Sequence, residues 1–168
     1  MIAARQRAAL FALVATASVS AAGGACADPH QVKQGDITIS SRMVRTSFGN
    51  SPNSAAYMVI GNSGAAPDKL VSARCACAAS VGIHMTENMA GMSTMQSAGP
   101  ITIPAHGQVT FRPGGLHLML THLKEPLVEG GEQDITLVFQ RAGAVRASFH
   151  IRARIPTGAA PPMRGMSQ

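Results

Sequence analysis

The sequence predicts an all-β domain, built as an antiparallel β-sandwich. Apolar and polar residues alternate over short segments that are rich in β-branched side chains. Turn-forming residues, chiefly Gly, Pro, Asn and Asp, separate these segments about every ten residues. No segment shows a sustained helical period of apolar residues. These three observations favour strands packed in two layers around one core.

The expected strands follow one another along the chain. Residues 36–45 (DITISSRMVR) alternate and are rich in β-branched side chains, and a turn-rich loop separates them from the next apolar stretch. Pro104 closes one short strand, the Pro-Gly-Gly turn at 113–115 precedes another, and Gly143 links the last two. The expected strands are 36–45, 55–60, 69–74, 78–86, 101–103, 108–112, 116–120, 134–140 and 145–155.

The first residues are typical of a secretory signal peptide. Arg5 and Arg7 form a basic start, residues 8–22 are apolar and small, and Ala-Cys-Ala at 25–27 is an A-x-A cleavage signal. Cleavage there would leave a chain of ordinary size for one domain. The expected units are a signal peptide at 1–27, a β-sandwich domain at 28–155 and a disordered Pro/Gly-rich tail at 156–168.

Cys26 offers an alternative, because a lipoprotein would carry its lipid on this cysteine. The residues before it, Gly23, Gly24 and Ala25, lack the branched aliphatic side chain that is usual there, so cleavage is preferred over lipidation. The apolar run is too short and too rich in Ala and Ser to span a bilayer, and no later stretch is apolar enough. We therefore expect a soluble, monomeric protein of the bacterial periplasm, without stable membrane insertion.

Charge and aromatic content exclude several classes of function. The formal net charge is +6, but the positive residues are scattered, and the sequence has one Tyr and no Trp. Nucleic-acid binding is therefore not expected, whereas this charge suits contact with an acidic protein partner. The sequence shows no nucleophile–base pair, paired carboxylates or phosphate-binding loop. We expect a binding protein and not an enzyme.

A methionine-rich segment and a downstream His-x-Met pair carry the candidate chemistry. The segment begins at His84, and His117 and Met119 lie further along the chain. Thioethers are soft ligands that favour Cu(I), imidazole also binds copper, and methionine forms no disulfide in an oxidising compartment. Because thioethers are neutral, weak ligands, such a site suits the transfer of copper better than its retention. The methionines of the segment are Met85, Met89, Met92 and Met95.

The spacing allows two chain segments to form one site. His117 and Met119 are two residues apart, so on a strand they project from the same face. His84 is expected at the end of an earlier strand, and Met95 lies just past a turn at residues 90–91. A sandwich can bring such strand ends together at one rim.

This pattern resembles the H(M)x10Mx21HxM signature of the PCu(A)C-type periplasmic copper chaperones. Ten residues separate His84 from Met95, and twenty-one separate Met95 from His117. Flanking residues across 36–151 resemble the same family. They are Ala56-Tyr57, Glu87-Asn88, Pro113-Gly114-Gly115, Leu123-Lys124 and Phe139 with Ala142-Gly143.

The resemblance implies a cupredoxin-like Greek-key β-sandwich that binds Cu(I) through His84, Met95, His117 and Met119. It also implies delivery of copper to an accepting protein. The acceptor would be cytochrome c oxidase, notably the subunit with the dinuclear CuA centre, reached directly or alongside a thioredoxin-like copper chaperone.

The other candidate ligands have simpler interpretations. Three methionines of the segment are spaced i, i+4, i+7, which fits a helical packing stripe; a soft rim that helps copper to enter, or auxiliary ligation, are alternatives. These methionines are Met85, Met89 and Met92. His122 is expected at a solvated strand end, and Met163 and Met166 in a surface tail that could also catch copper.

Cys75 and Cys77 depart from the family pattern, which has small or Pro-containing sequence there. A disulfide between residues i and i+2 is strained, so two small buried thiols are the simplest interpretation. A second copper site or a redox pair are the alternatives. Two other hypotheses for the whole protein follow: a thiol–disulfide reductant that uses Cys75 and Cys77 on a copper acceptor, and a metal-free β-sandwich adaptor with a methionine contact surface.

Overall fold

The computed structural model describes residues 31–47, 51–89 and 92–155. Every regular element in this part of the chain is a strand, which confirms the all-β class, and no described helix could cross a membrane. Cys26, the signal peptide expected at 1–27 and the tail expected at 156–168 lie outside the described residues. The strands are β1 (Val32–Gln34), β2 (Ile37–Arg45), β3 (Ser54–Asn62), β4 (Asp68–Arg74), β5 (Ala78–Met89), β6 (Met92–Ser97), β7 (Ile101–Ile103), β8 (Gly107–Phe111), β9 (Leu116–Leu123), β10 (Glu132–Phe139) and β11 (Gly143–Arg152).

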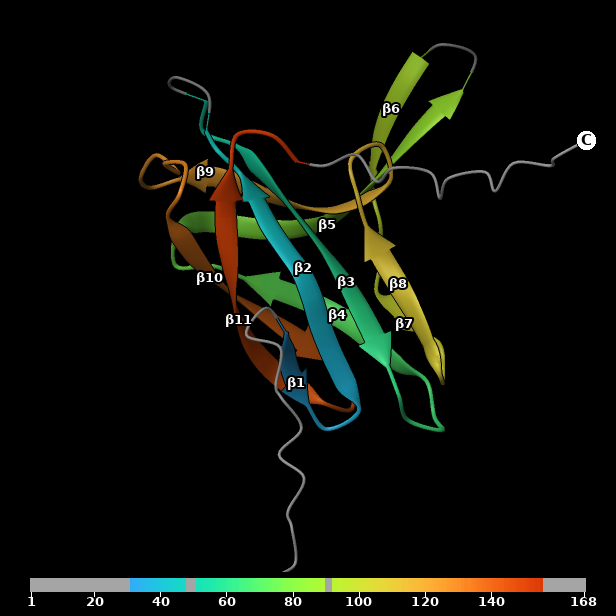
Figure 1. Cartoon of the computed structure of the whole chain (residues 1–168). Coiled ribbons are helices and arrows are strands. Elements are labelled where there is room, and N and C mark those ends of the chain that lie inside the picture. Colours follow the sequence, from blue (N-terminus) through green and yellow to red (C-terminus); the bar gives the residue numbers. More distant parts are fainter. Residues whose placement is uncertain (1–30, 48–50, 90–91, 156–168) are drawn as a thin grey trace, which may run out of the picture.

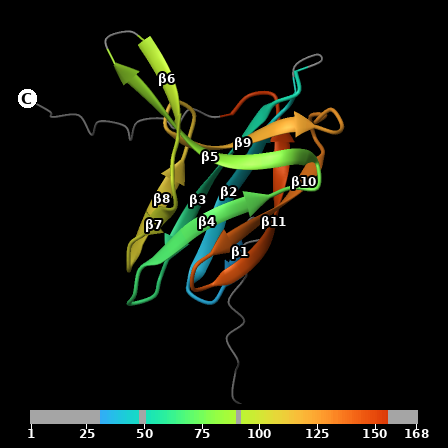
Figure 2. The ribbon, with the colours of Figure 1, turned by 180° about the vertical axis from the view of Figure 1, so that it is seen from behind.

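The strands form one continuous hydrogen-bonded sheet that folds into two layers. Their order is β6-β5-β9-β3-β2-β11-β10-β4-β7, with β1 paired to β2 and β8 paired to β3. In Figure 1, β2 and β3 lie in front of β4; in the reverse view of Figure 2, β4 and β5 lie in front of β2 and β3. The described pairs are antiparallel except for β11 and β2, which run parallel. The predicted sandwich is confirmed, with one parallel contact in it.

The core lies between the layers, where alternate side chains of each strand meet. In β11, Val145, Ala147 and Phe149 are buried, whereas Arg146 between them is exposed. This period of two is the one expected for a strand with one face on the core, and it is what the sequence pattern had indicated. The largest fully buried side chains are Phe149, Ile37, Ile39, Met58, Ile60, Leu70, Ile103, Leu118, Leu120, Ile135, Leu137 and Val44.

Several strands differ from the predicted ones, and β5 and β9 each run three residues further, to Met89 and Leu123. β1 and β6 were not predicted, and all six residues of β6 are exposed, so this strand has no buried face that could give an apolar alternation. The last strand ends at Arg152, three residues before the expected end. There the N–H of Ala153 donates to Oε1 of Glu129 at 3.1 Å instead of continuing the sheet.

Candidate metal site

The methionine-rich segment is a β-hairpin formed by β5 and β6. Its Cα pairs run from His84 with Ser97 to Met89 with Met92, and Figure 1 shows the hairpin extending beyond the two layers. The interpretation of Met85, Met89 and Met92 as a helical packing stripe is therefore wrong, because their spacing spans a turn between two paired strands. His84 also does not end its strand as expected, since β5 continues to Met89.

The register of β6, β5 and β9 places all four expected ligands on one face of this three-stranded ribbon. Positions 82, 84 and 86 of β5 are two residues apart and lie on the face opposite that of the buried Ile83, so they project to the same side. The direct partners of these positions are Met119, His117 and Met95 respectively. Side chains that oppose one another directly in a sheet point to the same side. Met95 and Met119 are thus each two residues, about 7 Å, along the ribbon from the level of the His84–His117 pair. A flexible thioether can reach across this distance.

His117 is the most enclosed of these side chains and is already oriented by the backbone. Only 4% of its surface is exposed, and its Nδ1 lies 3.0 Å from the carbonyl oxygen of Gly115. A carbonyl can only accept, so Nδ1 carries the proton and Nε2 keeps a free lone pair for a metal. The His84 ring centroid lies 6.0 Å away. One ring of the candidate pair is therefore held in place by a backbone hydrogen bond.

Tyr57 of β3 encloses His117 from the neighbouring strand. Their ring centroids are 6.5 Å apart, and Tyr57 is itself buried. Burial raises the pKa of the Tyr57 phenol, and the positive charge of Arg45 opposes this only in part. The phenol is therefore neutral at physiological pH, and it excludes water from one side of the imidazole.

Gly82 leaves the space that the His84 imidazole occupies. A Cβ added at Gly82 would lie 2.8 Å from Nε2 of His84, so the ring lies directly over the glycine backbone. Met119 is the direct cross-strand partner of this glycine. The absence of a side chain thus lets an imidazole nitrogen lie on the side of the ribbon where the thioether of Met119 projects. Two imidazoles and nearby thioethers fit a soft metal ion such as Cu(I).

Replacing Gly82 with alanine is expected to weaken Cu(I) binding by about tenfold, because the new methyl group displaces His84 without removing any ligand. Anaerobic competition with a Cu(I) chelator measures this change. The matched control is Gly61→Ala in β3, where an added Cβ would meet only the Thr38 carbonyl oxygen, at 4.0 Å. Equal affinities in the two variants would show that Gly82 does not position the imidazole.

The solvent exposure of the candidate ligands increases along the three-stranded ribbon from β9 to β6. Met119 is half-buried and contributes to the wall of a cavity of about 370 Å³, together with Ser54, Ala55 and Arg45. Met95 is 52% exposed on the edge strand β6. The candidate site is therefore closed at His117 and open at Met95.

Other possible ligands lie elsewhere. Met85 pairs with Gln96, so it projects from the opposite face of the ribbon, and Met92, four residues before Gln96 in β6, shares that face. His122 is exposed, as predicted, with its N–H 3.4 Å from Oδ1 of Asn53. Within the described residues no group of three or more His, Cys, Asp or Glu side chains could hold a metal ion. Met163 and Met166 lie outside those residues.

Cys75 and Cys77 form a disulfide, so the interpretation as two free thiols is wrong for this structure. The turn between β4 and β5 brings their Cα atoms to 5.1 Å, which is within the range that a disulfide can bridge. Ala78 pairs with Leu123 and His84 with His117, so the bond lies about 20 Å along β5 from the histidines. It is a separate feature of the molecule.

Sequence reasoning missed Gly82, Tyr57 and the Gly115 carbonyl as parts of this site. A glycine inside an otherwise apolar strand marks a close approach of another group, and that signal was present at Gly82. No sequence signal identified the group that approaches it. The contacts of Tyr57 and of the Gly115 carbonyl depend on tertiary packing.

The family model described as "Putative lipoprotein LpqE-like" matches residues 37–151. This chain belongs to the LpqE-like family. A relative in Leifsonia xyli subsp. xyli (strain CTCB07), "Putative lipoprotein Lxx21020", is 35% identical over 109 residues, which are 64% of each chain. The match thus spans less than two thirds of that relative.

Solved structures place this LpqE-like chain among PCuAC domains. The copper-bound PCuAC domain from PmoF2 is 28% identical with a TM-score of 0.65, and the match covers 74% of this chain and 99% of that one. The apo PCuAC domain from PmoF1 is 30% identical with a TM-score of 0.66, covering 74% and 100%. CuI-DR1885 from Deinococcus radiodurans is 29% identical with a TM-score of 0.55, covering 70% and 80%. The resemblance to PCu(A)C-type proteins that the signature indicated is confirmed.

Proposed function

We propose that this protein is an exported copper chaperone that carries one Cu(I) ion on His84, Met95, His117 and Met119. The observation that carries the proposal is the register of β6, β5 and β9, which gives two imidazoles and two thioethers a common face. The similarity to a copper-bound PCuAC domain and to CuI-DR1885 supports Cu(I) as the cargo. The lipoprotein names of the family and of the relative support export.

The gradient of exposure suggests how copper enters and leaves. Cu(I) first meets the exposed thioether of Met95 and then reaches Nε2 of His117, where the protein excludes water. Thioethers are weak, neutral ligands, so an acceptor can replace them one at a time without proton transfer. Met95 is the first ligand that an acceptor would replace, because it lies at the open end of the site.

The surroundings of the site favour an acidic acceptor surface. Arg45 and Arg154 contribute to a cavity of about 320 Å³ beside Tyr57, which contacts His117. Opposite charges on an acceptor would speed the encounter and fix its orientation. We propose the CuA-bearing subunit of cytochrome c oxidase as this acceptor, with a thioredoxin-like copper chaperone as the alternative.

Two measurements on the purified protein test the proposal. In an anaerobic titration with a competing chelator, the protein should retain one equivalent of Cu(I). The loaded protein should then transfer its copper to a copper-free CuA domain, measured as the metal content of each protein after separation. Failure to bind one equivalent would leave the metal-free adaptor as the better hypothesis. Binding without transfer would remove the CuA domain as the acceptor and leave copper carriage intact.

A further inference from the structure

The Cys75–Cys77 disulfide adds little to the stability of the fold. It closes a loop around one residue, and the stabilisation from a cross-link grows with the length of the loop that it closes. Backbone hydrogen bonds already hold the turn: Lys124 N–H donates to the Cys77 carbonyl at 2.9 Å, and Ala78 N–H to the Cys75 carbonyl at 3.5 Å. A structural role alone therefore explains this bond poorly.

The disulfide borders a groove that can receive an extended polypeptide. This groove, of about 450 Å³, lies at the end of the sandwich where β5 begins and β9 ends. Its apolar wall includes Val128, which is 70% exposed, as well as Leu127 and Ile151. Cys77 lines the same groove, together with the cationic Lys124 and the acidic Glu125 and Glu132. A segment bound there would therefore lie beside a sulfur atom and beside charged groups of both signs.

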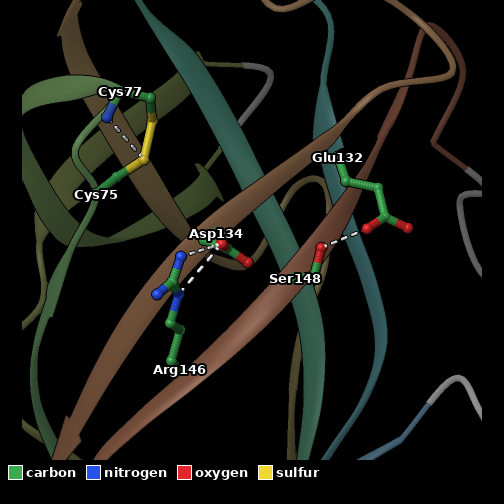
Figure 3. Close-up of polar contacts among 6 residues, drawn as sticks. All are labelled: Cys75, Cys77, Glu132, Asp134, Arg146 and Ser148. Atoms are coloured by element: carbon green, nitrogen blue, oxygen red, sulfur yellow. Dashed lines mark hydrogen bonds and ion pairs between the residues drawn. A yellow bond between two sulfur atoms is a disulfide. The ribbon is translucent and has the colours of Figure 1, made fainter.

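The two sulfur atoms are not equivalent. The backbone nitrogen of Cys77 lies 3.2 Å from Sγ of Cys75. Figure 3 marks this contact with a dashed line, and of the two cysteines Cys77 lines the groove. A backbone N–H stabilises a thiolate more strongly than a neutral sulfur, so Cys75 is the better leaving group. A thiolate in the groove would attack Sγ of Cys77 and release Cys75.

We infer that Cys75 and Cys77 form a thiol–disulfide exchange site, which accepts two electrons from a dithiol segment of a partner protein bound in this groove. The first partner thiolate bonds to Sγ of Cys77 while the Cys75–Cys77 bond breaks, and Cys75 leaves as a thiolate. The second partner thiolate attacks the first partner sulfur, forms the partner's disulfide and releases Cys77. The two protons lost by the partner's thiols end on Cys75 and Cys77. This chemistry requires no copper.

The order of attack can be tested with a synthetic apolar peptide that carries one thiol. The full wild-type chain is incubated with the reduced peptide, and free thiols are then blocked with N-ethylmaleimide at low pH. Tandem mass spectrometry should find the peptide on Cys77 and the maleimide on Cys75. The reverse distribution, or no adduct, would overturn the inference. With a two-cysteine peptide, the peptide should become oxidised as the protein gains two free thiols.

Groove variants test whether the partner segment binds beside the disulfide. Val128→Asp should slow exchange with the apolar peptide by about tenfold while leaving exchange with glutathione unchanged. Val71→Asp is the matched control, because Val71 is an exposed valine, 45% accessible, on β4 away from the groove lining. Equal rates in both variants would exclude the groove. The double variant C75S/C77S should fold and bind Cu(I) like the wild type.

Discussion

Replacing Met119 with alanine is expected to weaken Cu(I) binding roughly a hundredfold or more. Changes to groups that only orient metal ligands already lower the affinity about 10–100-fold, and this substitution removes a proposed ligand. Met119 is the cross-strand partner of Gly82, and the His84 ring lies over this glycine. The thioether of Met119 is therefore on the side of the ribbon where Nε2 of His84 lies. Anaerobic competition with a Cu(I) chelator measures the loss.

Two further variants separate ligation from packing. Met119→Leu preserves the apolar volume but removes the sulfur, so its affinity should fall as far as that of the alanine variant. Met92→Ala removes a thioether that is 74% exposed on the other face of the same hairpin, so it should bind as the wild type does. Wild-type affinity in Met119→Leu would mean that Met119 is not a ligand, even if copper binds elsewhere.

Replacing Asp68 with alanine is expected to lower the free energy of unfolding by about 3 kcal/mol at neutral pH. Asp68 is 4% exposed and accepts three backbone hydrogen bonds. Its Oδ1 receives the N–H groups of Lys69 at 2.7 Å and Arg141 at 2.8 Å, and its Oδ2 receives that of Ala142 at 2.9 Å. The substitution leaves the N–H groups of Arg141 and Ala142 unpaired in the turn between β10 and β11, and that of Lys69 unpaired in β4. Urea unfolding measures the difference.

The effect of Asp68 should depend on pH. Burial alone would raise the pKa of this carboxyl, but the hydrogen bonds from Arg141, Ala142 and Lys69 favour the charged form more strongly, so the pKa lies below its ordinary value. The folded pKa is thus lower than the unfolded one, about 3.9. The stabilisation is complete above the unfolded pKa and is lost as the pH falls through the folded pKa.

Asp134→Ala is the matched control for Asp68. Asp134 pairs with Arg146 in Figure 3, but the two side chains are 44% and 74% exposed. Solvent screens such a pair, so its loss should cost less than about 1 kcal/mol. Equal destabilisation by the two substitutions at neutral pH would contradict the role given to the buried carboxylate.

Local patterning predicted much of this fold. β10 and β11 alternate between core and solvent over residues 132–139 and 143–152, and β2 does so on either side of a register shift between Ser40 and Met43. The common face of His117 and Met119 follows from their spacing within one strand. These features depend on neighbouring residues only, so the sequence contains them directly.

Pairing between distant strands could not be predicted in this way. His84 and Met95 join the same face because β5 pairs with both β6 and β9 in one particular register. A shift of one residue in either pair would move a proposed ligand to the other side, and nothing local to His84 or Met95 fixes that register. The Cys75–Cys77 bond was missed for a different reason: the turn conformation, and not the spacing, decides whether the two sulfur atoms meet.

Core-facing and outward-facing residues alternate in β5 and β9, so folding and metal binding can be changed by separate mutations. Ile83 and Leu118 are buried in the core, and each is the chain neighbour of a histidine on the outer face. A substitution at His84 therefore leaves the hydrophobic contacts of Ile83 in place, and the metal-free chain keeps its core. During divergence, members of this fold could lose, change or regain metal ligands one at a time while the sandwich persisted.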